Sequence, residues 1–362
     1  MRSITPQPGI MDIALYQGGQ SHLAGVDHVL KLSSNENPLG APASAIKALS
    51  EAAVGMHLYP PTDHAALRDA IGDVWEVDPD RVICGVGSDE VLQFVTQAFS
   101  GPGDEIIYTE HGFSMYPILT SMAGATRVCV PEVERVVDVD AILSAVTDRT
   151  RVVLLANPAN PTGTMLPEGE LERLADALPS YVILVIDGAY AEFAAGYDGG
   201  ISLAKDRDNV LVTRTFSKIY GLGGLRVGWG YGPQQMIDVM TRIRQPFNLS
   251  VVQLAAAEAA VRDRNWVKQC AMLNLEQRAR LTGAVRQLGL ACDESHANFV
   301  LARAADSHEA DAAEAALNAA GILVRRVAGY GFPEGLRITV GDAEQTGRVI
   351  DALTKWREGA AA

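Results

Sequence analysis

The residues with the clearest chemical potential lie between positions 213 and 232, in the segment TRTFSKIYGLGGLRVGWGYG. Lys218 follows a strand-like run there, and a lysine amine can form a Schiff base with a carbonyl when nearby groups hold the product in place. Thr215, Ser217 and Arg226 are the kinds of side chain that bind an anionic phosphate. This combination indicates a cofactor that carries both an aldehyde and a phosphate, as pyridoxal phosphate (PLP) does.

A second group, IDGAY at 186–190, ends an apolar run that is typical of a buried strand. Open α/β sheets bind ligands at the carboxyl ends of their strands, which is where Asp187 is expected to stand. A carboxylate against the pyridine nitrogen of PLP keeps that nitrogen protonated, so the ring can accept electrons. Tyr190 could donate to the ring oxygen. An isolated aspartate at a strand end more often caps a turn. The interpretation of Asp187 as a PLP ligand is therefore supported only in combination with Lys218.

Two further loops follow strand-like runs. NPANPTG at 157–163 places Asn160 where it too could reach the ring oxygen. GVGSDE at 85–90 turns into a helix, and the backbone N–H groups at that helix start form an anion site at Ser88 and Asp89. Ser88 is equally consistent with an N-cap. Nucleotide binding is the competing interpretation of this loop, but neither GxxxxGK[ST] nor GxGxxG occurs there.

Taken together, the motifs resemble those of the fold-type I PLP-dependent aminotransferases, and more narrowly the histidinol-phosphate aminotransferases. The resemblance covers nearly the whole chain and rests on eight segments in the family's order: LSSNENPLG, LYP (58–60), GVGSDE, FSMYP (113–117), NPANPTG, IDGAY, FSKIYGLGGLRVG and LRITVG. It implies an α/β fold with a large PLP-binding domain, in which helices flank a mostly parallel seven-stranded sheet. A smaller α+β domain would be formed by the C-terminal part and the N-terminal arm.

The resemblance also implies a role for each matching residue. Lys218 would bind PLP covalently and move the substrate proton, while Asp187 would pair with the ring nitrogen. The other implied cofactor contacts are Tyr190 and Asn160 at the ring oxygen, Phe113 stacked on the ring, Tyr59 from a dimer partner, and Ser88, Asp89, Thr215, Ser217 and Arg226 at the phosphate. The implied substrate contacts are Tyr16, Asn37, Arg325 and Arg337.

Two positions depart from the family pattern. Relatives commonly read DEAY where this chain has DGAY, so Gly188 lacks a side chain beside Asp187. Many relatives have tyrosine where this chain has Phe113. Neither change removes a group that the chemistry requires, and both are predicted to tune substrate preference.

The implied reaction is transamination between histidinol phosphate and 2-oxoglutarate, which gives imidazole acetol phosphate and glutamate in histidine biosynthesis. The resemblance further implies a homodimer with a shared active site. One alternative is an aromatic amino-acid (phenylalanine or tyrosine) aminotransferase, because imidazole and phenyl are both flat rings. Another is a PLP-dependent amino-acid-phosphate decarboxylase. A PLP-sensing regulator would need a DNA-binding module, for which the arm before residue 40 is too short and too little basic.

The elements that must position these residues can be read from the hydrophobic pattern. Several strand-like runs are continuously apolar, which is typical of parallel strands covered on both faces. The runs lie at 81–86, 104–109, 126–131, 151–156, 181–187, 209–213 and 225–231, and helices such as 167–178 lie between them. One long helical stretch, 251–289, then leads to the strands 298–303, 322–326 and 336–340 and the helices 307–320 and 342–356. We predict an arm over 1–40, a large domain over 41–260 and a small domain over 261–362.

The composition of the chain limits the classes of molecule that it is expected to bind. Of the 362 residues, 48% are hydrophobic and 20% are charged, which is the balance of an ordered globular protein. A formal charge of −14 disfavours nucleic acid and anionic membranes. The four cysteines are widely separated, the histidines never fall in HxxxH or HExxH spacing, and residues 1–10 do not read as a secretory signal. We therefore expect a cytoplasmic enzyme that acts on small molecules, with no metal.

Overall fold

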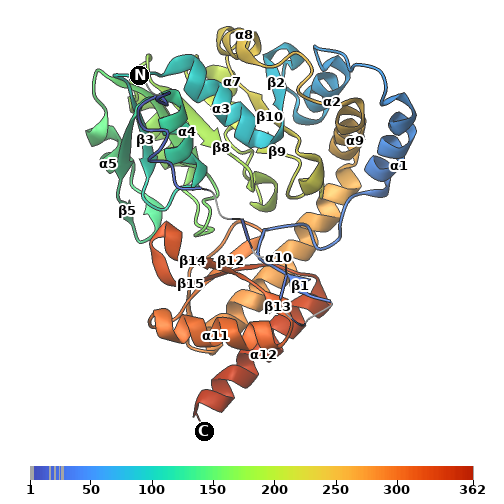
Figure 1. The fold of residues 1–362 in the computed structure, drawn as a ribbon, viewed down its shortest axis with the longest axis vertical. Helices are drawn as coiled ribbons and strands as arrows, with labels where there is room; N and C mark the ends of the chain where they lie inside the picture. The colour runs from blue at the N-terminus through green and yellow to red at the C-terminus, as the bar shows by residue number, and fades with distance from the viewer. Residues whose placement is uncertain (1–3, 16–17, 20–21, 24, 26–27, 362) are drawn as a thin grey trace.

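The computed structural model describes residues 4–15, 18–19, 22–23, 25 and 28–361. Figure 1 shows an upper body built around one large sheet and a lower body built around a smaller sheet. The long helix α10 (Arg264–Gln287) runs from one body to the other. The site residues must therefore be placed with respect to both sheets.

The large sheet has seven strands, and six of them run in the same direction. The exception is β10, which is antiparallel to both of its neighbours, β2 and β9. This confirms the predicted mostly parallel seven-stranded sheet. In spatial order the strands are β2 (Val82–Gly85), β10 (Gly228–Tyr231), β9 (Val210–Thr215), β8 (Ile183–Asp187), β7 (Thr150–Ala156), β3 (Glu105–Thr109) and β4 (Thr126–Val130).

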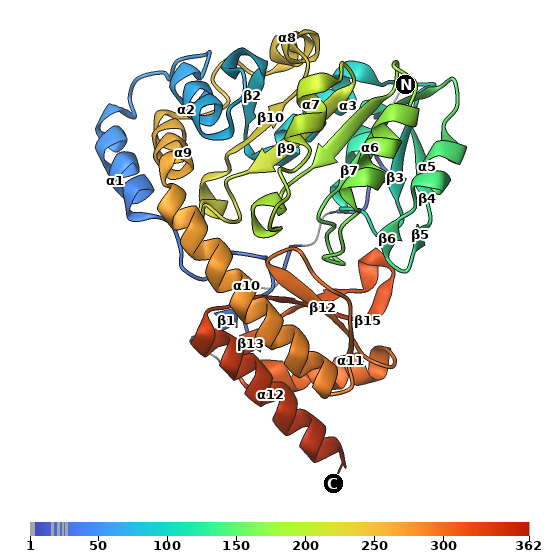
Figure 2. The same ribbon diagram turned by 180° about the vertical axis from the view of Figure 1, so that it is seen from behind.

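Two hydrophobic clusters explain why the central strands are continuously apolar. Successive side chains of a strand point to opposite faces. In β7, Val152 and Leu154 therefore pack into one cluster, and Val153 and Leu155 into the other. The first cluster includes α3 (Gly87–Phe99), α4 (Met115–Ala123) and α8 (Gln234–Ile243), which are in front in Figure 1. The second includes α1 (Ala43–Ala52), α2 (Ala65–Trp75), α5 (Val139–Ala145), α6 (Glu168–Ala177), α7 (Ile201–Asp206) and α9 (Val251–Arg262); α6 and α7 are in front in Figure 2.

The small sheet is antiparallel and has a separate core. Its order is β11 (Ala291–Cys292), β12 (Phe299–Arg303), β15 (Phe332–Thr339) and β14 (Arg325–Val327), and α10, α11 (Ser307–Ala319) and α12 (Ala343–Ala361) cover it. From the N-terminal arm, β1 (Leu30–Lys31) pairs in parallel with β13 (Ile322–Leu323), and Leu32 is buried in this core. The arm thus joins the lower body. The domain boundaries at 40 and 260 stay predictions.

Two predicted elements are divided in the structure. The stretch 251–289 forms two helices, because the Asp263 side chain accepts a hydrogen bond from the Trp266 backbone N–H (3.1 Å) and begins α10. The stretch 322–326 divides at Val324, where the chain leaves its pairing with β1 and joins β15. Within the described part of the chain, we find no helix that combines the length and the apolar character needed to cross a bilayer.

Candidate active site

A cavity of about 190 Å³ lies where the carboxyl ends of the large-sheet strands face the lower body. Parallel strands end at one edge, so the loops after β2, β3, β7, β8 and β9 all reach it. The predicted site residues that line it are Ser88, Asp89, Phe113, Asn160, Asp187, Tyr190, Thr215, Ser217, Lys218, Arg226, Arg325 and Arg337. Residues separated by more than two hundred positions thus meet in one place.

Three predicted residues are not among those that line the cavity. Tyr16 lies outside the described residues. Asn37 donates through Nδ2 to the Ile219 carbonyl (2.8 Å) and to Cys270 Sγ (3.2 Å), which places it beside the segment that carries Lys218. Tyr59 is 80% exposed, and its ring stacks on Phe247 with centroids 4.6 Å apart.

Lys218 lies in the cavity wall three residues after the end of β9. Its Nζ donates to the Ser34 carbonyl (3.3 Å) and lies 5.7 Å from the centre of the Tyr190 ring. Burial, and after it the nearby Arg337 cation, lower the pKa of Lys218 to about 8. At pH 7 about a tenth of the amine is therefore unprotonated, which is the form that attacks an aldehyde and is far more than an ordinary lysine offers.

Asp187 ends β8 and is only 4% exposed. Burial raises the pKa of its carboxyl to about 6, although hydrogen bonds from Tyr116 and Thr213 oppose this. Tyr116 Oη donates to Oδ2 and Thr213 Oγ1 donates to Oδ1, each at 3.1 Å. Neither donor is evident from the sequence, since Tyr116 is distant from Asp187 along the chain and Thr213 has the pattern of an ordinary strand residue. The carboxylate is held in one orientation in a place that favours a cationic partner.

A cradle of polar groups, of the kind that can bind an anion, lies at the N-terminus of α3. Arg226 reaches across it, donating from Nη1 to Ser217 Oγ (3.0 Å) and from Nη2 to Asp89 Oδ2 (2.8 Å). Because Ser217 Oγ accepts from Arg226, its own proton can be donated to an anion. Gly87 has φ +78°, and a Cβ there would lie 2.5 Å from Arg226 Nη2, so only glycine leaves the cradle open.

Two arginines of the small sheet face this cradle across the cavity. Arg325 on β14 and Arg337 on β15 are register partners. A charge inside a buried strand needs polar partners, and Arg337 donates from Nη1 to Asn160 Oδ1 (2.6 Å) and from Nη2 to the Ser33 carbonyl (2.9 Å). Because Asn160 Oδ1 is an acceptor here, its Nδ2 is the group that can donate into the cavity.

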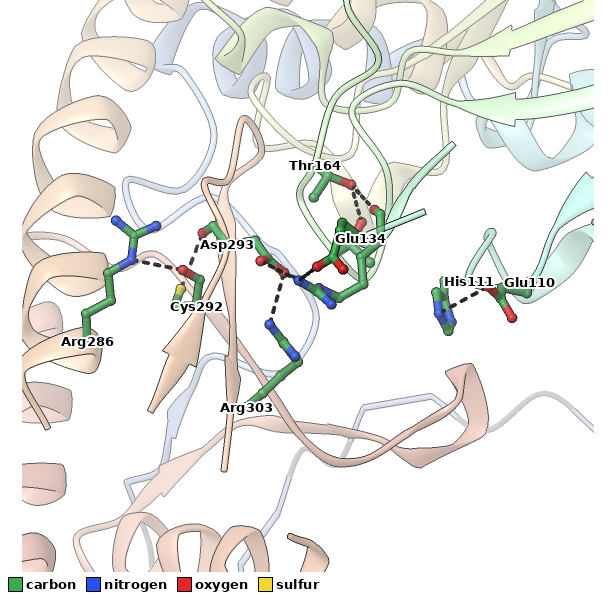
Figure 3. A network of polar contacts seen from close by, with 10 residues as sticks. Glu110, His111, Glu134, Thr164, Arg286, Cys292, Asp293 and Arg303 are labelled. Carbon is green, nitrogen blue, oxygen red and sulfur yellow. Dashed lines mark hydrogen bonds and ion pairs between the residues drawn. The ribbon is translucent and has the colours of Figure 1, made fainter. Parts of the chain in front are cut away.

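A polar network joins the segment that follows the Asn160 loop to the lower body (Figure 3). The turn between β5 (Glu132–Val133) and β6 (Val136–Val137) carries Arg135, which donates from Nε and Nη2 to the Asp293 carboxylate at 2.5 and 2.9 Å. Thr164, just after the Asn160 loop, donates to the Arg135 carbonyl (2.6 Å). This paired, half-buried contact fixes that segment with respect to the small sheet.

Gly188 does not line the cavity. A Cβ at this position would lie 3.1 Å from Arg214 Nε, and Arg214 is fully buried beneath the ring of Trp75. The missing side chain therefore leaves room for a core arginine, and any influence of Gly188 on substrate preference would be indirect. Phe113, the other departure, does line the cavity, edge-on to Tyr116.

We expect Gly188→Ala to lower the free energy of unfolding by about 1–3 kcal/mol, because Arg214 has no room to move away. kcat/KM should change less than about twofold, since the added methyl faces the core. Denaturant unfolding and steady-state kinetics measure the two quantities. Gly169→Ala is the matched control: this position lies in α6 with open space around it, and alanine should not destabilise it. A variant as stable as wild type would contradict the prediction.

The donor set fits a specific kind of ligand. The cavity offers a lysine amine for an aldehyde, a phosphate cradle, a buried carboxylate for a ring nitrogen and amide and phenol groups for a ring oxygen. PLP has all four of these features. No group of three or more histidine, cysteine or acidic side chains in the described segments is arranged to hold a metal ion.

Comparisons with known proteins agree with this geometry. A family model described as aminotransferase class I and II matches residues 27–353. The histidinol-phosphate aminotransferase of Ruegeria pomeroyi is 64% identical over 361 residues, which is 100% of both chains, and that of Roseobacter denitrificans is 60% identical over 98% of this chain and 99% of the relative. The crystal structure of histidinol-phosphate aminotransferase from Sinorhizobium meliloti in complex with pyridoxal-5′-phosphate matches with a TM-score of 0.89 at 26% identity and covers 98% of each chain. This chain therefore has the fold-type I architecture and belongs to the class I and II aminotransferase family.

Proposed function

We propose that the chain is a PLP-dependent aminotransferase that converts histidinol phosphate and 2-oxoglutarate into imidazole acetol phosphate and glutamate in histidine biosynthesis. The observation that carries the proposal is the shared cavity, in which Lys218 and Asp187 face two arginines of the small sheet. Names of relatives that are 55–64% identical over nearly the whole chain support the substrate. We place the reaction in the cytoplasm, where the four cysteines, which form no disulfide here, would stay reduced.

When bound, PLP supplies an aldehyde that combines with amino groups and a ring that accepts negative charge. With PLP bound, Lys218 would be the base that takes the proton from the substrate Cα and the acid that returns it at the cofactor C4′. Asp187 keeps the ring nitrogen protonated, and Asn160 and Tyr190 donate to the ring oxygen. Ser88, Asp89, Thr215, Ser217 and Arg226 hold the cofactor phosphate, and Phe113 stacks on the ring.

Arg337 and Arg325 bind the anionic end of the substrate in this proposal. Arg337 leaves the Asn160 oxygen to bind a carboxylate of glutamate or the phosphate of histidinol phosphate, and Arg325 is the second phosphate ligand. Tyr16 and Asn37 are kept as substrate contacts from the arm. For Asn37 this requires the side chain to leave Ile219 and Cys270.

The proposal is tested by the substrate preference of an Arg325→Met variant. We expect kcat/KM for histidinol phosphate to fall by about 100-fold, since charge-assisted hydrogen bonds to a phosphate contribute roughly 1.5–3 kcal/mol. kcat/KM for phenylalanine, which has no phosphate, should fall less than about tenfold. Steady-state kinetics with 2-oxoglutarate and mass spectrometry of the products measure both.

Arg326→Met is the control, because Arg326 pairs with Asp311 and does not line the cavity. Equal losses for both donors would contradict a phosphate-binding role. A wild-type protein that prefers phenylalanine or tyrosine would favour the aromatic aminotransferase. Release of CO₂ with no need for a 2-oxo acid would identify the decarboxylase.

We also propose that the enzyme is a homodimer in which Tyr59 reaches the PLP site of the partner subunit. Large apolar side chains are exposed to water over a short stretch of α1 and the loop that follows it, which marks a protein interface. They are Ile46, Val54, Met56, Leu58 and Tyr59.

A Met56→Glu variant should convert the dimer into a monomer and weaken PLP binding at least about tenfold, because a buried unpaired charge costs several kcal/mol at an interface. Sedimentation velocity and PLP titration measure the two effects. Val133→Glu is the control, since Val133 is similarly exposed but lies on β5. Wild-type protein that sediments as a monomer and still binds PLP tightly would overturn the dimer proposal.

A further inference from the structure

Three consecutive residues of the N-terminal arm each hold a different group of the cavity. The Ser33 carbonyl accepts from Arg337 Nη2 (2.9 Å) and the Ser34 carbonyl accepts from Lys218 Nζ (3.3 Å). Asn35 Nδ2 donates to Tyr190 Oη (2.9 Å). The segment thus lies between the two sheets and contacts side chains from both. These residues belong to the LSSNENPLG motif, and the sequence alone predicts no role for any of the three.

Asn35 is buried, and hydrogen bonds hold both its backbone and its side chain. It is 1% exposed, and its φ of +57° lies in the left-handed region, which asparagine tolerates better than most residues. Its N–H donates to Thr339 Oγ1 (3.0 Å), and its carbonyl accepts from Asn298 Nδ2 (3.0 Å). The side chain therefore has one available placement.

The orientation of the Asn35 amide follows from hydrogen-bond logic. Thr339 Oγ1 accepts from the Asn35 N–H and donates its own proton to Asn35 Oδ1 (3.2 Å). Oδ1 is thereby fixed as the acceptor on the Thr339 side. Nδ2 must then face Tyr190, and an amide nitrogen can only donate.

The phenol oxygen of Tyr190 is thus an acceptor toward Asn35, and its own proton must be donated elsewhere. Tyr190 is buried against Phe299, and burial raises the pKa of the phenol, so the proton is present at neutral pH. The phenol also lines the cavity. The charged groups that face Tyr190 are Lys218, Arg337, Asp187 and Asp89.

We infer that Asn35 is a positioning residue that directs the phenolic proton of Tyr190 into the cavity, toward the ring oxygen of the cofactor. The inference rests on the proposed binding of PLP. Thr339 contributes by holding the oxygen of the Asn35 amide, so that the nitrogen faces Tyr190. The arm segment therefore sets the direction of one hydrogen bond in the site, in addition to closing the space between the two bodies.

The test replaces Asn35 with aspartate, which has the same shape but only accepts on both oxygens. Tyr190 would then donate to the carboxylate, and the ring oxygen would lose its donor. An oxygen without a donor is more basic, so the pH midpoint of the visible absorption change of the PLP-loaded protein should rise by about one unit. A pH titration of the absorption spectrum measures this without any turnover.

A double-mutant cycle separates hydrogen-bond direction from added charge. If Asn35 acts through Tyr190, Asn35→Asp should shift the midpoint by less than about 0.3 units in a Tyr190→Phe background. Asn35→Gly keeps the left-handed backbone but neither donates nor accepts, and should shift the midpoint by less than half as much as aspartate. If the aspartate variant does not fold, Thr339→Val tests the same chain of hydrogen bonds, because the Asn35 amide can then rotate and exchange its oxygen and nitrogen. Thr339→Ser keeps the hydroxyl and should keep the wild-type midpoint.

Equal shifts in the wild-type and Tyr190→Phe backgrounds would overturn the inference, since the carboxylate would then act by charge alone. Absence of any shift would also overturn it. Neither result affects the proposed function, which fails separately if the wild-type protein shows no PLP absorption that depends on Lys218.

Discussion

Replacing Lys218 with alanine is expected to lower kcat/KM for transamination by more than about 1,000-fold, because general acid–base catalysis alone contributes roughly 10²–10⁴. Among the described residues that line the cavity, Lys218 is the one lysine, so no neighbouring amine can take its place. The visible absorption of bound PLP should change as well, since the amine that would hold the aldehyde is gone. Steady-state kinetics and absorption spectra of the purified variant measure both effects.

Lys218→Arg separates charge from amine chemistry. Arginine keeps the cation beside the Ser34 carbonyl, but its guanidinium stays protonated, so the same loss of activity is expected. Lys205→Ala is the control, because Lys205 is an exposed residue of α7 and does not line the cavity. Turnover and a wild-type spectrum in the alanine variant would contradict the assignment of Lys218 and, with it, the proposed function.

The part of this site that the sequence predicts is limited by the separation along the chain between residues that contact each other. Lys218, Asp187 and Asn160 each follow an apolar run, and the rule that parallel strands end at one edge brings them together. The seven-stranded sheet follows from the same pattern. The residues that fix these groups were not predictable in this way, because Tyr116 and Asn35 approach from other parts of the chain.

The direction in which a side chain points was a second feature that the sequence did not predict. The LSSNENPLG motif contains both Asn35 and Asn37, and a substrate role is predicted for Asn37 alone. In the structure Asn35 contacts Tyr190, whereas Asn37 turns toward Ile219 and Cys270. Likewise the absence of a side chain at Gly188 is predicted to tune substrate preference, but in the structure Gly188 packs on Arg214 and does not line the cavity. A motif identifies which residues matter more readily than which way a side chain points.

Asp187 shows how the fold is prepared for a ligand at a cost to its own stability. The pKa of the buried carboxyl is about 6, above the ordinary value of 3.8. The folded protein therefore binds this proton more tightly than the unfolded chain does. As the pH rises from about 4 to about 6, the stability of the cofactor-free protein falls, and it stays low above that range. The shift corresponds to about 3 kcal/mol at neutral pH.

Asp187→Asn should remove this penalty and, at the same time, the partner of the ring nitrogen. The cofactor-free variant is expected to be more stable than wild type at pH 7–8, by up to about 3 kcal/mol, and equally stable near pH 4. Its kcat/KM should fall by at least about 100-fold, because the ring nitrogen would no longer be held protonated. Denaturant unfolding across pH and steady-state kinetics measure the two opposite effects.

Asp198→Asn gives the opposite sign and serves as the control. Although burial opposes it, hydrogen bonds from Ser202 and Gly200 lower the pKa of Asp198, so its carboxylate stabilises the folded state above the ordinary pKa. That variant should be less stable than wild type at pH 7. Addition of PLP should stabilise the wild type more than Asp187→Asn, because the cationic ring nitrogen offsets the buried charge. If Asp187→Asn were instead destabilised at pH 7, the carboxylate would be a structural element of the core, and its pairing with a cofactor would lose its physical basis.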